Sequence, residues 1–121
     1  MKVYTYKNCS TCREAVKWLR EQAIAFDELP IRESPPSPAE LRATLEAFGG
    51  DVRQLFNTSG QDYRALGLKD KLAAMPAEEA LALLAANGNL VKRPFVIDLD
   101  RGIHATGFKP AEWQQKLDRA T

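Results

Sequence analysis

The sequence lacks any hydrophobic run that approaches the roughly 20 residues needed to span a membrane. Its N-terminus, MKVYTYKNC, also lacks the apolar stretch of a signal peptide. An excess of one charge sign is missing too, because the net charge is only +1. No electrostatic footprint therefore favours nucleic acid or an anionic membrane. These absences predict a cytoplasmic protein with no direct nucleic-acid partner and no membrane partner.

Cysteine and histidine are also scarce, with two cysteines and one histidine in the chain. In a reducing compartment, two cysteines are not expected to form a permanent structural disulfide. A closed structural zinc site usually needs four ligands. The one histidine, His104, lies far from Cys9 and Cys12 in sequence, and although carboxylates could complete a site, no ligand spacing indicates one. We therefore expect no metal site and no tightly bound cofactor.

What the sequence does contain suits one globular domain. It has 121 residues, of which 45% are hydrophobic and 27% are charged. A chain of this length can bury a core without disulfides or metal. We therefore predict that residues 1–121 form a single domain.

The first thirty residues predict a strand, a helix and a second strand. Residues 3–6 are β-prone, and apolar residues recur at helical spacing from Ser10 onwards, with Ser10 or Thr11 as the expected cap. Residues 24–29 predict the second strand, which Pro30 helps to end. Such a βαβ unit has parallel strands and a right-handed crossover.

A helical block and a second β unit follow. Residues 37–88 predict one longer helix, capped by Ser37, and then several short helical pieces. Residues 95–97 and 103–105 predict a hairpin, and residues 109–120 predict a last helix. The order βαβ–ββα predicts an α/β, thioredoxin-like fold with a four-stranded mixed sheet, into which the helical block of about 37–88 is inserted.

Three residues outside the predicted site have simpler interpretations. Trp18 and Trp113 lie at helical spacing and are expected to pack helices against the sheet. His104 alternates with apolar neighbours and is expected to point to solvent.

The Cys-x-x-Cys pair has three interpretations: a redox couple, half of a metal site, or two small buried residues. We favour the redox couple. In the predicted layout Cys9 precedes a helix, whose free N–H groups and dipole stabilise a thiolate. Arg13 adds positive charge nearby, and Cys12 lies one turn away, where it could resolve a mixed disulfide formed at Cys9.

The segment KRPF is the second informative stretch. In a thioredoxin layout, Pro94 falls where a cis-proline loop faces the cysteine helix. Arg93 would then lie near Cys9 and bind a thiolate, a glutathione carboxylate or an oxyanion. The alternative is that Arg93 is a solvated charge at a strand edge, and the sequence alone does not decide between the two.

The segments YTYKNCSTCREAVKWLRE, LFNTSGQDYRALGL and LVKRPFVID together resemble the arsenate reductase/Spx-like family of thioredoxin-fold proteins. The resemblance implies that, in the reductases of this family, a cysteine at the position of Cys9 attacks arsenate and arginines bind the oxyanion. One of these arginines corresponds to Arg93, whereas two others correspond to Asn57 and Lys109. Lysine keeps the charge without the bidentate fork, and asparagine loses the charge. We therefore expect a weakened anion site, with arsenate a doubtful substrate.

For Spx-type regulators, the resemblance implies that the Cys9–Cys12 pair acts as a thiol/disulfide switch in a protein that binds the RNA polymerase alpha subunit. Our prediction is a thiol–disulfide oxidoreductase that uses glutathione as co-substrate, or glutaredoxin or thioredoxin as partner. The alternative is a non-enzymatic switch. The predicted catalytic residues are Cys9, Cys12 and Arg93. Seven further residues are predicted to bind substrate: Asn8, Ser10, Thr11, Arg13, Asn57, Pro94 and Lys109.

Overall fold

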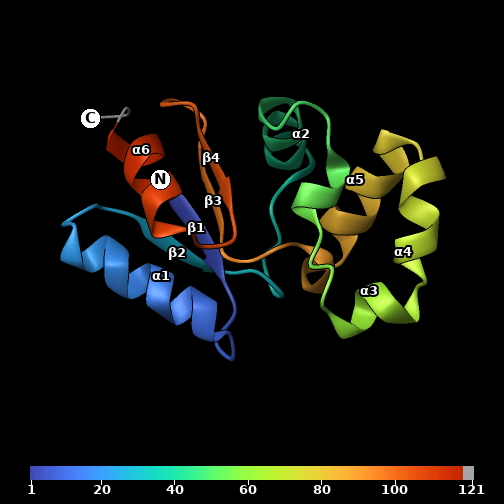
Figure 1. The fold of residues 1–121 in the computed structure, drawn as a ribbon, viewed down its shortest axis with the longest axis horizontal. Coiled ribbons are helices and arrows are strands. Elements are labelled where there is room, and N and C mark those ends of the chain that lie inside the picture. The colour runs from blue at the N-terminus through green and yellow to red at the C-terminus, as the bar shows by residue number, and fades with distance from the viewer. Residues whose placement is uncertain (119–121) are drawn as a thin grey trace.

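The computed structural model describes residues 1–118, so the end of the predicted last helix, residues 119–120, lies outside the described part. Four strands alternate with α-helices and short 3₁₀ turns (Figure 1). In chain order these are β1 (Lys2–Thr5), α1 (Ser10–Glu21), β2 (Asp27–Pro30), α2 (Pro38–Ala47), η1 (Val52–Leu55), α3 (Gln61–Ala65), α4 (Leu68–Lys71), η2 (Leu72–Ala74), α5 (Ala77–Ala86), η3 (Gly88–Leu90), β3 (Phe95–Asp98), β4 (Ile103–Thr106) and α6 (Pro110–Asp118).

The strands form one mixed sheet in the order β2-β1-β3-β4. β1 pairs in parallel with β2, and Val3 lies opposite Glu28. β3 is antiparallel to both β1 and β4, so Val96 lies between Val3 and Ala105. The parallel pair followed by an antiparallel hairpin confirms the predicted thioredoxin-like sheet.

The side chains of the strands alternate between two cores, because successive residues of a strand point to opposite faces. Tyr4, Phe95 and Ile97 pack against the helices that lie between β2 and β3 in sequence. Val3 and Val96 face the other way, towards α1 and α6. Figure 1 shows this division, with α1 and α6 on one side and α2 to α5 on the other.

An aromatic cluster joins α1 and α6. The ring of Trp18 lies 6.1 Å from those of Trp113 and Phe108, and the last two rings are 4.9 Å apart. Trp113 is buried and its indole N–H donates to the carbonyl of Gly107 at 3.0 Å. Edge-to-face contacts of this kind stabilise a core beyond the area they bury. The predicted packing role of both tryptophans is confirmed.

A buried carboxylate fixes the start of the helical block against the sheet. Glu40 completes a capping box with Ser37, and the Tyr4 hydroxyl donates to its carboxylate at 2.8 Å. Lys2 lies 3.1 Å from the same carboxylate. Burial opposes ionisation, but the hydrogen bonds from Ser37, Tyr4 and Lys2 outweigh it and lower the pKa of Glu40. An ionised carboxylate thus joins β1 to α2.

Two local predictions were wrong. The second strand begins at Asp27, because Ile24 and Phe26 precede it and pack against the α1–α6 core instead of pairing with β1. His104 does not simply face solvent, since its Nδ1 lies 2.9 Å from the hydroxyl of Thr44 on α2. Burial, with the nearby charge of Lys116, lowers the pKa of His104.

No helix within residues 1–118 is both long and apolar enough to cross a bilayer. Over the same residues, no three histidine, cysteine or carboxylate side chains gather in a way that would hold a metal ion.

Candidate active site

Cys9 is the N-cap of α1. Its backbone is extended, with φ −112° and ψ 110°, and its sulfur accepts a hydrogen bond from the backbone N–H of Cys12 at 3.2 Å. The cap predicted at Ser10 or Thr11 is therefore one or two residues too late. A cap side chain usually contributes an oxygen. Here the sulfur of Cys9 fills that position, so it lies at the positive end of the helix dipole.

Cys12 lies beneath Cys9 and is only 2% exposed. Both cysteines are free thiols. Burial raises the pKa of Cys12 to about 12, and its hydrogen bond with Cys9 acts in the same direction. The two cysteines therefore differ: Cys9 is half-buried at the helix start, and Cys12 is a buried thiol that stays protonated near neutral pH.

The loop before α1 is held at both ends. The backbone N–H of Cys9 donates to the carbonyl of Tyr6 at 3.1 Å, and the guanidinium of Arg13 donates to the carbonyl of Lys7 at 3.0 Å. Asn8 donates to the Tyr6 hydroxyl at 3.4 Å. Asn8 and Arg13 were both predicted to bind substrate; Asn8 lies in this loop, and Arg13, in α1, reaches back to it. Two further predicted residues, Ser10 and Thr11, are exposed in the first turn of α1.

Arg93 and Pro94 lie where the sequence predicts them. The peptide bond between them is cis. Arg93 is half-buried; its guanidinium donates to the carbonyl of Asn89 at 2.9 Å and lies 5.2 Å from the centre of the Tyr6 ring. Its charge also favours the ionised form of Cys12, which places it within electrostatic reach of the cysteine pair. The guanidinium of Arg93 is therefore fixed by a hydrogen bond close to the cysteine pair. It is not the solvated charge at a strand edge that the sequence left as the alternative.

The other two predicted anion-binding positions differ from each other. Asn57 is half-buried, and its amide donates to the carbonyl of Asn89 at 3.5 Å, the same carbonyl that Arg93 contacts. Lys109 is exposed just before α6. Within residues 1–118, no hydrogen bond or ion pair joins the Lys109 side chain to the cysteine loop.

Arg32 and Asp62 reach the site without having been predicted. Arg32 follows β2, and its guanidinium donates to the Tyr6 hydroxyl at 2.9 Å. Asp62, in α3, accepts from the amides of Asn87 at 2.9 Å and Asn89 at 3.3 Å. Nothing in the local pattern marks either residue, because their proximity arises from segments far apart in sequence.

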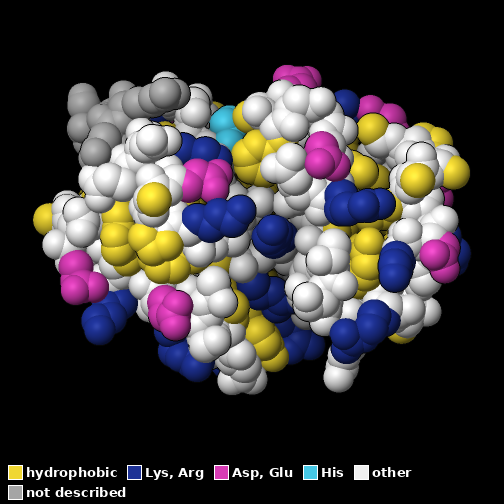
Figure 2. Space-filling view, in the orientation of Figure 1, with side chains coloured by type: hydrophobic (Ala, Val, Ile, Leu, Met, Phe, Trp, Pro, Cys, Tyr) yellow, Lys and Arg dark blue, Asp and Glu magenta, His cyan; other side chains and the backbone are white. Residues whose placement is uncertain are grey.

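A groove of about 630 Å³ runs along α1 beside Cys12. Val16 and the ring of Tyr6 contribute apolar surface, and Glu21 and Glu28 contribute acidic groups. Its basic lining residues are Lys7, Arg13, Lys17 and Arg20. Figure 2 shows lysine and arginine side chains gathered along the lower edge of the molecule, where Figure 1 places α1 and the loop before it. The lining of the groove is therefore more basic than acidic.

Comparison with known proteins gives a consistent family assignment. The model of the ArsC family matches residues 4–116. The uncharacterized protein YusI of Bacillus subtilis is 45% identical over 112 residues, which is 93% of each chain. The global transcriptional regulator Spx of Enterococcus faecalis is 31% identical over 117 residues, covering 97% of this chain and 86% of the regulator.

A solved structure agrees with the sequence comparisons. The crystal structure of a possible arsenate reductase from Streptococcus mutans superposes with a TM-score of 0.86 at 42% identity, covering 97% of this chain and 96% of the other. This likeness extends over both halves of the sheet and the helices inserted between them.

Proposed function

The chain belongs to the ArsC family, and from that premise we propose that it is a thiol–disulfide oxidoreductase whose nucleophile is Cys9. The observation that carries the proposal is the hydrogen bond from the backbone N–H of Cys12 to the sulfur of Cys9. A negative charge on that sulfur is stabilised both by this donor and by the dipole of α1. The thiolate is the species that attacks disulfides.

The first step of the proposed reaction is a thiol–disulfide exchange. The Cys9 thiolate attacks one sulfur of a substrate disulfide; the Cys9–substrate bond forms, the substrate S–S bond breaks, and one thiolate leaves. In the second step Cys12 loses its proton to solvent and attacks the sulfur of Cys9. The second substrate thiolate then leaves and a Cys9–Cys12 disulfide remains. Two molecules of glutathione, or the dithiol of glutaredoxin or thioredoxin, return both cysteines to thiols and become the disulfide.

The high pKa of Cys12 fits its being the second of the two sulfurs to react. Burial raises that pKa to about 12, so near neutral pH the Cys12 thiol is protonated and does not compete with Cys9 for the same substrate. Arg93 beside the pair would position an anionic group of the substrate, and Pro94 would shape its groove. Reducing thiols of this kind belong to the cytoplasm, and a cytoplasmic location is part of the proposal.

Arsenate is the second substrate within this class. The crystallised relative from Streptococcus mutans is described as a possible arsenate reductase, and Arg93 supports an oxyanion at the site. Asn57 and Lys109 stand where two further arginines are expected, which weakens that support. Reduction of one arsenate to arsenite would take two electrons, which two thiols supply when they are oxidised to a disulfide.

A coupled assay tests the proposal. The purified chain is incubated with glutathione, glutaredoxin, glutathione reductase and NADPH, with either a mixed disulfide or arsenate as acceptor. Glutathione and glutaredoxin reduce mixed disulfides by themselves, so the same mixture without the chain gives the background rate. We expect NADPH loss above this background that depends on the acceptor and is absent in Cys9→Ser. NADPH loss that is equal in wild type and Cys9→Ser, with every acceptor, would exclude the proposed nucleophile.

A redox switch without turnover is the second candidate function. It is favoured by the 31% identity to a regulator called Spx and by the adjacency of Cys9 and Cys12 at one helix start. On this hypothesis the Cys9–Cys12 disulfide alters the start of α1 and thereby the binding of a protein such as the RNA polymerase alpha subunit.

Cys12→Ser separates the two candidates. Glutathione or glutaredoxin can resolve the mixed disulfide at Cys9 in place of Cys12, so turnover should largely survive this substitution, whereas a switch should lose its response to oxidant. Mass spectrometry after mild peroxide treatment measures the intramolecular bridge directly. If wild type never forms the bridge, both the resolving role and the switch role of Cys12 are excluded.

A further inference from the structure

Tyr6 carries two guanidinium groups beside the cysteine loop. The Cζ atom of Arg32 lies 5.1 Å and that of Arg93 lies 5.2 Å from the centre of its ring. The hydrogen bond from Asn8 lowers the pKa of the Tyr6 phenol, and the charge of Arg32 acts in the same direction. Two positive groups are thus held against one aromatic ring by cation–π contacts.

Neither guanidinium is neutralised by a salt bridge. Among the ion pairs within residues 1–118, none joins Arg32 or Arg93 to a carboxylate within 4.0 Å. Arg93 donates one hydrogen bond to the carbonyl of Asn89, and Arg32 donates one to the hydroxyl of Tyr6. Since a guanidinium has five N–H donors, most of these donors remain for a ligand.

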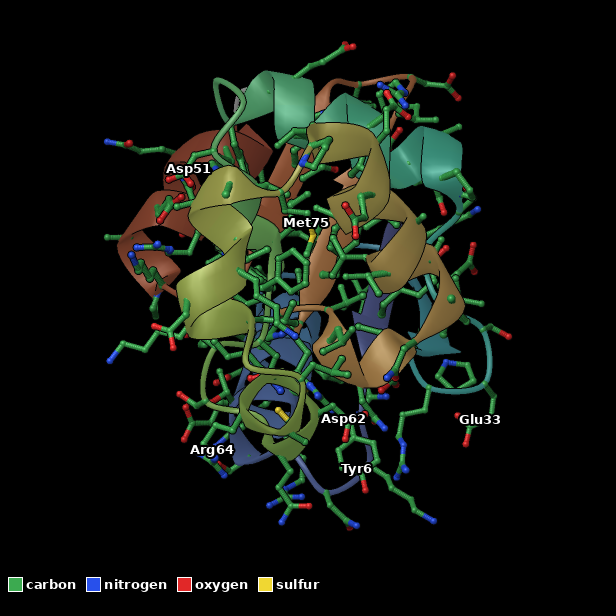
Figure 3. The ribbon with its side chains drawn as sticks, turned by 90° about the vertical axis from the view of Figure 1, so that its right-hand side faces the viewer. Tyr6, Glu33, Asp51, Asp62, Arg64 and Met75 are labelled. Atoms are coloured by element: carbon green, nitrogen blue, oxygen red, sulfur yellow. The ribbon has the colours of Figure 1, made fainter. Side chains whose placement is uncertain are left out.

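One carboxylate, Asp62, lies within electrostatic reach of both arginines. Hydrogen bonds from Asn87 and Asn89 lower the pKa of Asp62, and the charges of Arg32 and Arg93 lower it further. Asp62 is therefore ionised at neutral pH, and the two amides that bind one of its oxygens fix its position. In Figure 3 it lies in the same lower part of the molecule as Tyr6. Glu33 lines the hollow that Arg32, Asn87 and Asn89 also line, and no ion pair joins it to either arginine within residues 1–118.

A close backbone contact fixes the positions of Arg32, Arg93 and Asp62 relative to one another. The segment that carries Arg32 lies against η3 so tightly that a Cβ added at Gly88 would be 1.8 Å from the carbonyl oxygen of Ile31. The neighbours of Gly88 are Asn87 and Asn89, which hold Asp62, and Asn89 also binds Arg93. The two arginines and the carboxylate are thus positioned by the same few residues.

Two positive groups and one negative group are complementary to a carboxylate and an ammonium group on one carbon. A purely cationic ligand would be repelled by the two arginines, and a purely anionic one would leave Asp62 without a partner of opposite charge. We propose that Arg32, Arg93 and Asp62 form a subsite for the zwitterionic α-amino acid end of a low-molecular-weight thiol, with its carboxylate on the arginines and its ammonium on Asp62. This inference rests on the proposed function, because Tyr6, which bears both arginines, is hydrogen-bonded to the backbone of Cys9.

Two ligands present this chemistry: free cysteine and the γ-glutamyl end of glutathione. Their thioethers, S-methylcysteine and S-methylglutathione, keep the zwitterion but cannot exchange disulfides. N-acetyl-S-methylcysteine keeps the carboxylate and lacks the ammonium. Titration of each into the ¹⁵N-labelled chain, followed by NMR, measures binding independently of Cys9 chemistry.

We expect saturable binding of at least one zwitterionic thioether, with shifts at Tyr6, Arg32 and Asp62. Arg32→Leu and Asp62→Asn should each weaken it about fivefold, the factor that an exposed ion pair supplies. N-acetyl-S-methylcysteine should bind more weakly by a similar factor. Arg42→Leu is the matched control, because Arg42 is an exposed arginine that pairs with Glu78 on the helical block. Tighter binding of S-methylglutathione identifies the γ-glutamyl end, whereas equal binding of both zwitterions identifies the amino acid group alone.

The inference is overturned by an absence of saturable binding at millimolar concentration, by equal binding of the acetylated compound, or by variants that bind as wild type does. Failure of the proposed function looks different. A chain that binds S-methylglutathione through Arg32 but never reacts at Cys9 would contradict the oxidoreductase and leave the subsite intact.

Discussion

The sulfur of Cys9 accepts a hydrogen bond of 3.2 Å from the backbone N–H of Cys12, so the proposed nucleophile is also the cap of its own helix. The sulfur of Cys9 therefore has two roles, as the proposed nucleophile and as the group that stabilises the start of α1. A substitution at Cys9 alters both, and two variants are needed to separate them.

Serine and alanine at position 9 separate these effects. Serine is a preferred N-cap, so Cys9→Ser should keep the free energy of unfolding within about 0.5 kcal/mol of wild type. Cys9→Ala removes the acceptor and should cost about 1 kcal/mol. Urea unfolding monitored by circular dichroism measures both values. Both variants should lose reaction with disulfides, and equal stability of the two would contradict the capping role.

The burial of Cys12 predicts unequal labelling of the two thiols. Burial raises the pKa of Cys12 to about 12, so it remains a thiol in the folded protein throughout the range in which an ordinary cysteine ionises. Iodoacetamide at pH 8 should therefore modify Cys9 in the native chain and both cysteines in urea, as read by peptide mass spectrometry. Comparable labelling of Cys12 in the native chain would argue against a buried, protonated thiol.

The same shift predicts a loss of stability in alkali. A raised pKa means that the folded state holds the Cys12 proton more tightly, so its contribution is complete below the unfolded pKa of about 8.5 and falls as pH rises towards 12. The free energy of unfolding should decline more steeply above pH 9 in wild type than in Cys12→Ala. Parallel pH profiles of the two proteins would count against this linkage.

Glu40 predicts the opposite behaviour in acid. Its folded pKa is lowered by the hydrogen bonds from Ser37, Tyr4 and Lys2, so its contribution is complete above the unfolded pKa of about 4.3 and is lost as pH falls. Glu40→Gln should cost about 1–3 kcal/mol at pH 7, and the difference should shrink below pH 4. Chemical denaturation at several pH values measures it, with Glu79→Gln, at an exposed position of α5, as the control. An unchanged difference at pH 3 would contradict the assignment.

Gly88 should tolerate no side chain. A Cβ there would overlap the carbonyl oxygen of Ile31, so Gly88→Ala must move backbone and should destabilise the chain by about 1–3 kcal/mol. Gly102→Ala is a useful comparison because alanine would be strained at the φ of +67° that Gly102 adopts, whereas no atom lies within 4 Å of the added Cβ. It should cost about 1 kcal/mol, the penalty of the left-handed backbone alone. Equal losses at the two positions would show that the contact with Ile31 can relax.

The sequence predicted best where local pattern and chain order decide. The strands, the helix that follows the cysteines and the cap at Ser37 all follow from periodicity and capping chemistry. The cis bond at Pro94 followed from the fold assigned to the chain and not from local pattern. The predicted start of the second strand failed because Ile24 and Phe26 satisfy a strand pattern while packing beneath α1.

Other features depend on contacts that no local pattern encodes. Arg32 and Asp62 come beside Tyr6 only when the segment after β2 packs against η3, a contact across more than fifty residues. His104 was misplaced for the same reason, since its partner Thr44 lies on a helix sixty residues away. The cap at Cys9 was missed because sulfur is an unusual cap acceptor, and propensities favour Ser10 or Thr11.

Both tryptophans of the chain belong to the cluster that joins α1 to α6, with ring centres 6.1 Å apart. The helix that begins at the two sulfurs therefore carries one of the two strongest fluorophores of the protein and touches the other. If oxidation of the thiols shifts α1, we expect tryptophan emission to follow it in real time, with no dye attached and no residue replaced.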